Sequence, residues 1–240
     1  MGNSAGSLEK HMDTADKTGA LCFSHKKLDK FPVALQKVSG KLRNLDLSHN
    51  QLTTLPPWIE SFTQLRNLHL NDNRLKALPN ELAALVKLES LHVERNHLTA
   101  LPESLAQLKN LKELGAAQNR LGQFPAFTLT LKKLDTLNLA QNALVALPAD
   151  MSSLAVLELD LNQNQITVMP DTLARCPRLK TLRMEENCLP LTEVSEMVLA
   201  QSSISSLSLS GNLFNDKKLA DQPGYDKYLE RYTAIRRKLD

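Results

Sequence analysis

The chain has 240 residues, of which 42% are hydrophobic and 23% charged, and its formal net charge is +3. Since charges of both signs are interspersed along the chain, the composition argues against a nucleic-acid partner. No apolar run approaches the ~20 residues of a membrane span, and three distant cysteines have neither metal-ligand spacing nor a disulfide framework, so we expect an intracellular protein.

The N-terminal stretch "MGNSAGS" is similar to an N-myristoylation motif. Removal of Met1 exposes Gly2, but the motif has Ser or Thr at the sixth position and this chain has Gly6. One myristoyl chain binds membranes only marginally, with an association constant near ~10⁴ M⁻¹. We therefore expect residues 1–17 to be a flexible leader, with Gly2 as the candidate site of a reversible lipid anchor.

Residues 18–222 are expected to form about nine coils of a repeat. Asparagines recur at a nearly constant step, at Asn50, Asn73, Asn96, Asn119, Asn142, Asn164, Asn187 and Asn212. Around each one the sequence follows L-x-x-L-x-L-x-x-N-x-L, the pattern of a leucine-rich repeat. A degenerate copy at residues 21–32 has Lys26 at the asparagine position and is expected to be the N-terminal cap.

The repeat pattern predicts how each coil folds. Leucines such as Leu68 and Leu70 alternate with polar residues, so each coil contributes one strand with its leucines inward. The asparagine amide both donates and accepts, so it can satisfy backbone groups where the chain turns. The pattern therefore predicts an α/β fold: a leucine-rich-repeat solenoid, or horseshoe, with a parallel concave sheet and short helical or 3-10 turns on the convex side.

Function is expected at the positions that the repeat leaves variable. The outward strand positions form columns without aromatic residues, which favours a polar or charged protein-binding face. The candidate contact residues on this concave face are Asp46, His69, His92, Asp160, Arg183 and Glu185. His69 and His92 occupy one column in successive strands, so their side chains are expected about 5 Å apart.

The histidines also leave a second interpretation open. His49, His69 and His92, with Asp46 or Asp72 as a further ligand, would suit a metal protein or an enzyme. An open sheet offers no water-excluding pocket and no nucleophile beside a base, so we predict no catalytic residue, no metal and no cofactor.

A column eight residues after each asparagine is mostly polar, yet it holds Trp58 and Phe127. Exposed aromatic residues often anchor a partner, so Trp58 and Phe127 are a candidate lateral site. The alternative is that each ring folds over the apolar parts of its neighbours.

Residues 223–240 are expected to form a C-terminal capping helix. Tyr225, Tyr228, Leu229 and Tyr232 fall on one helical stripe, which suits a helix that covers the last coil.

Several motifs together resemble one family. They are "MGNSA", "LDLNQNQI" (159–166), "LRMEENCL" (182–189) and "GYDKYLERYTA" (224–234), and they are similar to the leucine-rich-repeat-containing protein 57 family. The resemblance implies a small intracellular protein with a myristoylated glycine, here Gly2, and with neither a known catalytic activity nor a defined ligand.

The sequence thus predicts a non-enzymatic, monomeric scaffold that binds a protein partner and is held peripherally at a membrane by its lipid. The alternatives are a soluble regulatory subunit without lipid and, less favoured, the metal-binding or enzymatic protein.

Overall fold

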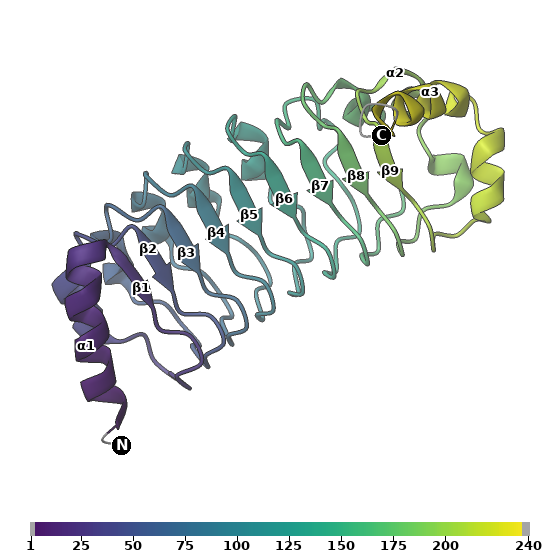
Figure 1. Cartoon of the computed structure of the whole chain (residues 1–240). Coiled ribbons are helices and arrows are strands. Elements are labelled where there is room, and N and C mark those ends of the chain that lie inside the picture. Colours follow the sequence, from purple (N-terminus) through teal and green to yellow (C-terminus); the bar gives the residue numbers. More distant parts are fainter. Residues whose placement is uncertain (1–2, 237–240) are drawn as a thin grey trace. The chain divides into compact units, whose positions relative to one another are not determined.

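The computed structural model describes residues 3–236, with the side chains of residues 11–234. The chain divides into two compact units, Met1–Arg120 and Leu121–Asp240, and each is described by itself. The described residues form nine short parallel strands, five in the first unit and four in the second (Figure 1). The predicted leucine-rich-repeat fold, with parallel strands and 3-10 turns, is confirmed.

The first unit begins with a helix and then alternates strands with 3-10 turns, in the order β1 to β5. Its elements are α1 (Asn3–Thr18), β1 (Ala20–Cys22), η1 (Val33–Val38), β2 (Asn44–Asp46), η2 (Pro57–Ser61), β3 (Asn67–His69), η3 (Asn80–Ala84), β4 (Ser90–His92), η4 (Glu103–Gln107) and β5 (Glu113–Gly115). Neighbouring strands pair in parallel, with Leu45 opposite Leu68 and Leu68 opposite Leu91. The constant repeat length thus sets the register of this sheet.

Helix α1 replaces the flexible leader that the sequence suggested. It lies beside β1, and its Met12 and Ala15 are buried (Figure 1). The helix ends at a glycine with positive φ, Gly19, whose N–H donates to the carbonyl of Ala15. A repeat array needs its first coil covered, which explains why this segment folds. Gly2, the candidate lipidation site, lies outside the described residues.

The second unit has four strands, with one α-helix before the last strand and a second at its end. Its elements are η5 (Ala126–Thr130), β6 (Thr136–Asn138), β7 (Glu158–Asp160), η6 (Asp171–Arg175), β8 (Thr181–Arg183), η7 (Leu191–Glu193), α2 (Glu196–Gln201), β9 (Ser206–Ser208), η8 (Asp216–Asp221) and α3 (Tyr225–Arg236). The strands pair in parallel in chain order. No described helix in either unit has the length and apolar character needed to cross a bilayer.

The cores of both units are columns of leucine beside a column of asparagine. The inward strand leucines, including Leu45, Leu68 and Leu159, are fully buried. Each repeat asparagine bonds to the backbone of its own coil and of the preceding one. Asn73, for example, donates from Nδ2 to the carbonyls of Leu47 and Leu70 at 3.0 and 2.9 Å. The predicted role of the asparagine column is thereby confirmed.

Helix α3 covers the last strand of the second unit. The Tyr228 hydroxyl accepts a hydrogen bond from the N–H of Leu207 in β9 at 3.1 Å. Arg231 donates to the carbonyl of Leu199, in α2, and to that of Ile204, just before β9. Of the predicted tyrosine stripe, Tyr228 is buried, whereas Leu229 is exposed.

Candidate functional site on the strand face

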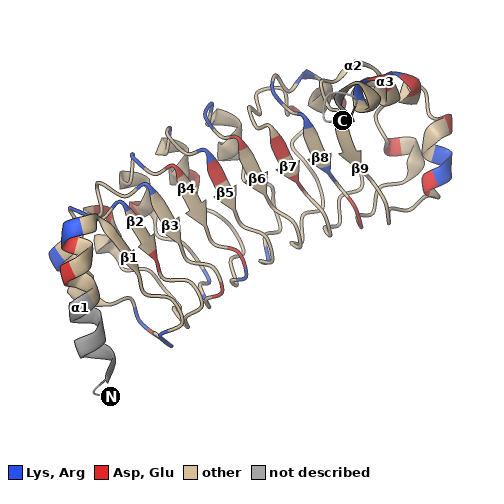
Figure 2. Cartoon of the chain, viewed as in Figure 1, with Lys and Arg blue, Asp and Glu red and all other residues tan. Residues whose placement is uncertain are grey.

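The candidate site is the exposed side of the strands, which we call the strand face. The first and third residues of each strand point to it, because the middle leucine points into the core. The predicted contact residues all lie on or just after these strands. The first unit holds Asp46, His69 and His92, and the second holds Asp160, Arg183 and Glu185. They therefore form two sites, and each is described within its own unit. Figure 2 shows acidic residues on strands β5 and β7.

Two stacked histidines mark the centre of the first unit's strand face. The rings of His69 and His92 are nearly parallel, with centroids 5.0 Å apart, as the register predicted. His92 lies between two carboxylates: its Nδ1 is 2.9 Å from Glu94 Oε1 and its Nε2 is 3.6 Å from Glu113 Oε2. The two imidazoles thus share a stacked geometry but have different polar surroundings.

These surroundings move the two histidine pKa values in opposite directions. The hydrogen bond to Glu94 raises the pKa of His92 above 6.5, against the effect of burial. Burial, followed by the neighbouring charge of His92, lowers the pKa of His69 below 6.5. Of the two stacked rings, His92 is therefore protonated more readily than His69.

Gly115 makes room for the arrangement of His92 and Glu94. A Cβ at position 115 would lie 1.8 Å from Glu94 Oε1 and 2.8 Å from His92 Nδ1. Any side chain larger than hydrogen would push the Glu94 carboxylate away from the imidazole. Gly115 is the third residue of β5, and the other strands carry polar residues at this position. The glycine is therefore part of the site.

Asp46 is an ionised carboxylate held in place by its neighbours. Its Oδ1 accepts hydrogen bonds from the N–H and the hydroxyl of Ser48, at 2.9 and 2.6 Å, and its Oδ2 accepts one from the Cys22 thiol at 3.3 Å. Burial acts to raise the pKa of Asp46, but the bonds from Ser48 and Cys22 outweigh it, so the pKa lies below its ordinary value.

A second histidine pair was not predicted. His25 and His49 stack with centroids 4.2 Å apart, and His49 Nδ1 is 3.3 Å from Asp72 Oδ2. Arg95 pairs with both oxygens of Asp72, and its guanidinium is the main cause of the lowered pKa of that carboxyl. The sequence signal was present: His25 and His49 occupy the same repeat position, directly before Lys26 and Asn50.

The second unit's strand face is mainly acidic around one arginine. Arg183 Nη1 donates to Glu158 Oε2 at 3.2 Å. The Glu185 N–H donates to the Asn162 side chain at 2.7 Å, and Asp160 Oδ1 accepts from the Asn162 N–H at 3.0 Å. Backbone and side-chain bonds thus fix the turn that presents Asp160, Arg183 and Glu185.

The two residues of the predicted lateral aromatic site, Trp58 and Phe127, are not an exposed pair of rings. Phe127 is only 2% exposed, because Thr128 takes the core position that Leu82 fills in an earlier repeat and the larger ring fills the remaining space. Trp58 is half-buried and packs on Phe31 and Phe62, with centroids 5.2 and 6.1 Å away. Both rings belong to their local cores, the alternative interpretation of this column.

The geometry of the histidines bears on the metal hypothesis. Among the residues that the structure describes, no three His, Cys, Asp or Glu side chains lie in an arrangement that could hold a metal ion. His92 uses both ring nitrogens on carboxylates, and the carboxylate of Asp72 bonds Arg95. The strand face is thus arranged for hydrogen bonds and ion pairs.

The opposed histidine pKa values give a first prediction. We expect Glu94→Gln to lower the pKa of His92, since the Glu94 carboxylate is the main cause of its elevation. Histidine side-chain NMR shifts followed from pH 5 to 9 measure it. Glu185→Gln is the control, because Glu185 holds the same repeat position in the second unit. An unchanged His92 titration in Glu94→Gln would contradict the assignment.

The sign of the linked stability follows from these directions. The raised pKa of His92 contributes stability that is fully present below pH 6.5 and is lost as pH rises through its folded-state pKa. His69 acts in reverse, because its lowered pKa makes the unfolded chain bind the proton more readily, so stability is lost as pH falls below 6.5. The two effects oppose one another, so residue-specific titration is the informative measurement.

The repeated leucine and asparagine columns and the polar strand face are those of a repeat protein built from leucine-rich coils. Two family models match the chain: "Leucine rich repeat" at residues 63–121 and 132–189, and "Leucine Rich repeats (2 copies)" at residues 40–84. Together they cover more than half of its length. The chain belongs to the leucine-rich-repeat proteins, a family of typically non-enzymatic binding modules.

Solved structures agree with this family. A Leptospira interrogans LRR protein is 32% identical with a TM-score of 0.81, over 92% of this chain and 54% of that one. The structure of PEPR1–AtPEP1 is 28% identical with a TM-score of 0.68, and the match covers 80% of this chain and 29% of that one. The ectodomain of the Arabidopsis receptor kinase HAESA, in complex with an IDA peptide hormone, is 24% identical with a TM-score of 0.63. The match covers 79% of this chain and 34% of that one, and it supports the fold alone. The chain thus spans about half or less of these proteins.

Proposed function

We propose that this protein is a non-enzymatic scaffold that binds a protein partner through its strand face. One observation carries the proposal: the buried leucines and asparagines repeat from coil to coil, whereas the strand-face side chains differ in each coil and are fixed by hydrogen bonds. Neither folding nor packing requires that variety, so it is available for recognition. The HAESA ectodomain, which has this fold, is in complex with a peptide hormone.

Site-specific cross-linking tests the proposal. A photo-reactive amino acid at Asp160 on the strand face is expected to cross-link one partner in cells, and the same group at the exposed Lys87, after η3, is the matched control. Replacement of Arg183 and Glu185 by alanine, with the photo-reactive group kept at position 160, should abolish the adduct. Equal cross-linking from positions 160 and 87, or an adduct that survives the double variant, would contradict a binding role for this face.

We further propose that the scaffold acts at a membrane, through reversible myristoylation of Gly2, in the cytoplasm. Support comes from the small residues of "MGNSA" and from the resemblance to the leucine-rich-repeat-containing protein 57 family. Alkyne-myristate labelling of the wild type and of Gly2→Ala, followed by membrane fractionation, tests it. Labelling and membrane recovery of the wild type alone are expected; an unlabelled wild type favours the soluble regulatory subunit.

A further inference from the structure

A hollow lies on the strand face of the first unit, between α1 and strands β1 to β3. Its volume is about 560 Å³, within the range of ligand sites. Thr14 and Thr18 of α1 form one wall, and the outward residues of the strands, among them Cys22, Asp46 and His69, form the floor. The helix thus turns an open sheet into a bounded site.

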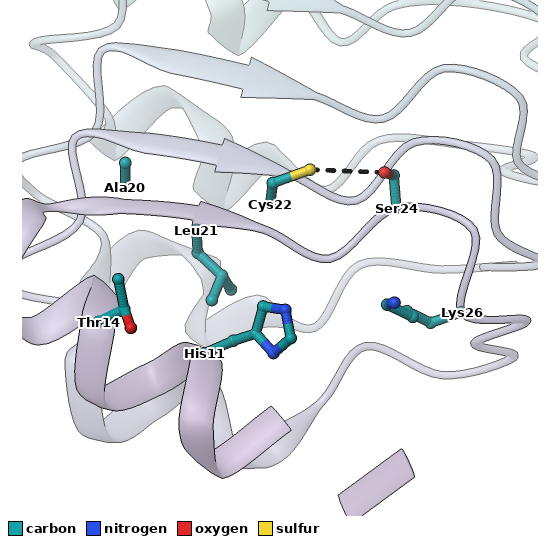
Figure 3. Close-up of a pocket in the computed structure, with 7 residues that line it drawn as sticks. All are labelled: His11, Thr14, Ala20, Leu21, Cys22, Ser24 and Lys26. Carbon is teal, nitrogen blue, oxygen red and sulfur yellow. Dashed lines mark hydrogen bonds between the residues drawn. The ribbon is translucent and has the colours of Figure 1, made fainter. Parts of the chain in front are cut away.

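A second hollow of about 590 Å³ adjoins the first along α1. It lies between His11 and Thr14 of α1 and the segment from Ala20 to Lys26, and it shares Thr14 and Cys22 with the first hollow (Figure 3). Each hollow is larger than one side chain requires, and the two share part of their lining. They suit an extended segment of polypeptide that runs beside the helix.

The charge of the first hollow favours a cation. Asp46 is its carboxylate, and burial lowers the pKa of the neighbouring His69, which disfavours a positive charge on that ring. Two other carboxylates of this unit, by contrast, have basic partners: Asp72 pairs with Arg95, and Glu89 pairs with both Arg66 and Lys112. Asp46 makes no ion pair with a described Lys or Arg. Its counter-ion is therefore available to come from outside the unit.

The hydrogen bonds of Asp46 also select the kind of cation. Its Oδ1 already accepts two bonds from Ser48, and its Oδ2 accepts one from Cys22. A guanidinium fork needs an acceptor position on each oxygen, whereas an ammonium group needs only one. The position that remains, on Oδ2, suits a single N–H donor.

We propose that this hollow binds a lysine side chain presented by an extended segment of a partner protein, with the Asp46 carboxylate as its counter-ion. The inference rests on the proposed binding function and names the chemistry that one part of the strand face recognises. The four-carbon stem of lysine lies against Ala20 and the threonine methyl groups, and the ammonium reaches Oδ2.

Titration with small probes tests the inference. Nα-acetyl-lysine N-methylamide is added to the ¹⁵N-labelled full chain, and the backbone amide shifts of Leu45 and Leu47 are followed. The expected result is saturable binding that the norleucine derivative, which has the four-carbon chain without the ammonium group, does not show. Asp46→Asn should weaken it about tenfold or more, the effect of losing a charged hydrogen-bond partner. Binding of the arginine derivative more tightly than lysine would overturn the inference.

Two variants keep the outcome interpretable. Asp150→Asn is the matched control, because Asp150 also accepts bonds from a serine two residues further on, Ser152, but lies in the second unit and outside its strands; lysine binding by this variant should match the wild type. Thr14→Phe fills the hollow from the helix side, leaves Asp46 in place and should also abolish binding. Equal lysine and norleucine binding, or full binding by Asp46→Asn, overturns the inference. The cross-linking at Asp160 reports on the proposed function independently.

Discussion

Asn73→Ala should destabilise the first unit by about 4 kcal/mol. Asn73 is 6% exposed, and its amide makes hydrogen bonds to several backbone groups. Nδ2 donates to the carbonyls of Leu47, Leu70 and Asn71, and Oδ1 accepts from the N–H of Leu52. Alanine leaves these groups buried without partners, at a cost of about 1–3 kcal/mol for each group that water cannot reach. Urea unfolding followed by circular dichroism measures the loss.

Asn44→Ala is the matched control for this prediction. Asn44 also lies in the first unit, but it is exposed and its side chain bonds only the side chain of Asn67. Its substitution should change the free energy of unfolding by no more than about 0.5 kcal/mol. If Asn73→Ala were as mild as this control, the column of asparagines would not hold the coils together as described.

The coils could be predicted from the sequence because each one obeys the same local rule. The asparagine step fixed the strand register, and the register placed His69 beside His92 before any coordinates were known. What the repeat could not predict is what happens where a coil departs from it. Thr128 is smaller than the leucine expected there, so Phe127 became buried rather than exposed.

The candidate site was less predictable, because its details depend on side-chain packing between coils. Nothing in the composition of residues 1–17 indicated that α1 would form one side of the hollow that Asp46 lines. Likewise, the residue before each asparagine adopts a left-handed backbone, as at Asp72 and Arg95, although glycine is rare in that column. The Asp72–Arg95 ion pair and the stacked rings of His25 and His49 follow from that backbone geometry, which residue types alone do not encode.

Arg231→Ala should destabilise the second unit by about 2 kcal/mol and loosen α3. The Arg231 guanidinium donates to the carbonyls of Val198, Leu199, Ala200 and Ile204 at the end of α2 and beyond it. A helix C-terminus leaves carbonyls without partners, and a cation there is favourable for both its hydrogen bonds and its charge. Burial lowers the pKa of Arg231 from its ordinary value, but the group stays charged in this position.

Amide hydrogen exchange at Leu207 gives the sharpest measurement of this prediction, because its N–H in β9 donates to the Tyr228 hydroxyl of the same helix. When α3 loosens, that amide should exchange faster, and the uncovered strand edge should make the variant prone to association. Lys227→Ala is the control on α3, since Lys227 is exposed and, among the described residues, pairs with Glu230 on the same helix. Unchanged protection at Leu207 in Arg231→Ala would show that Arg231 does not hold α3 over the last strand.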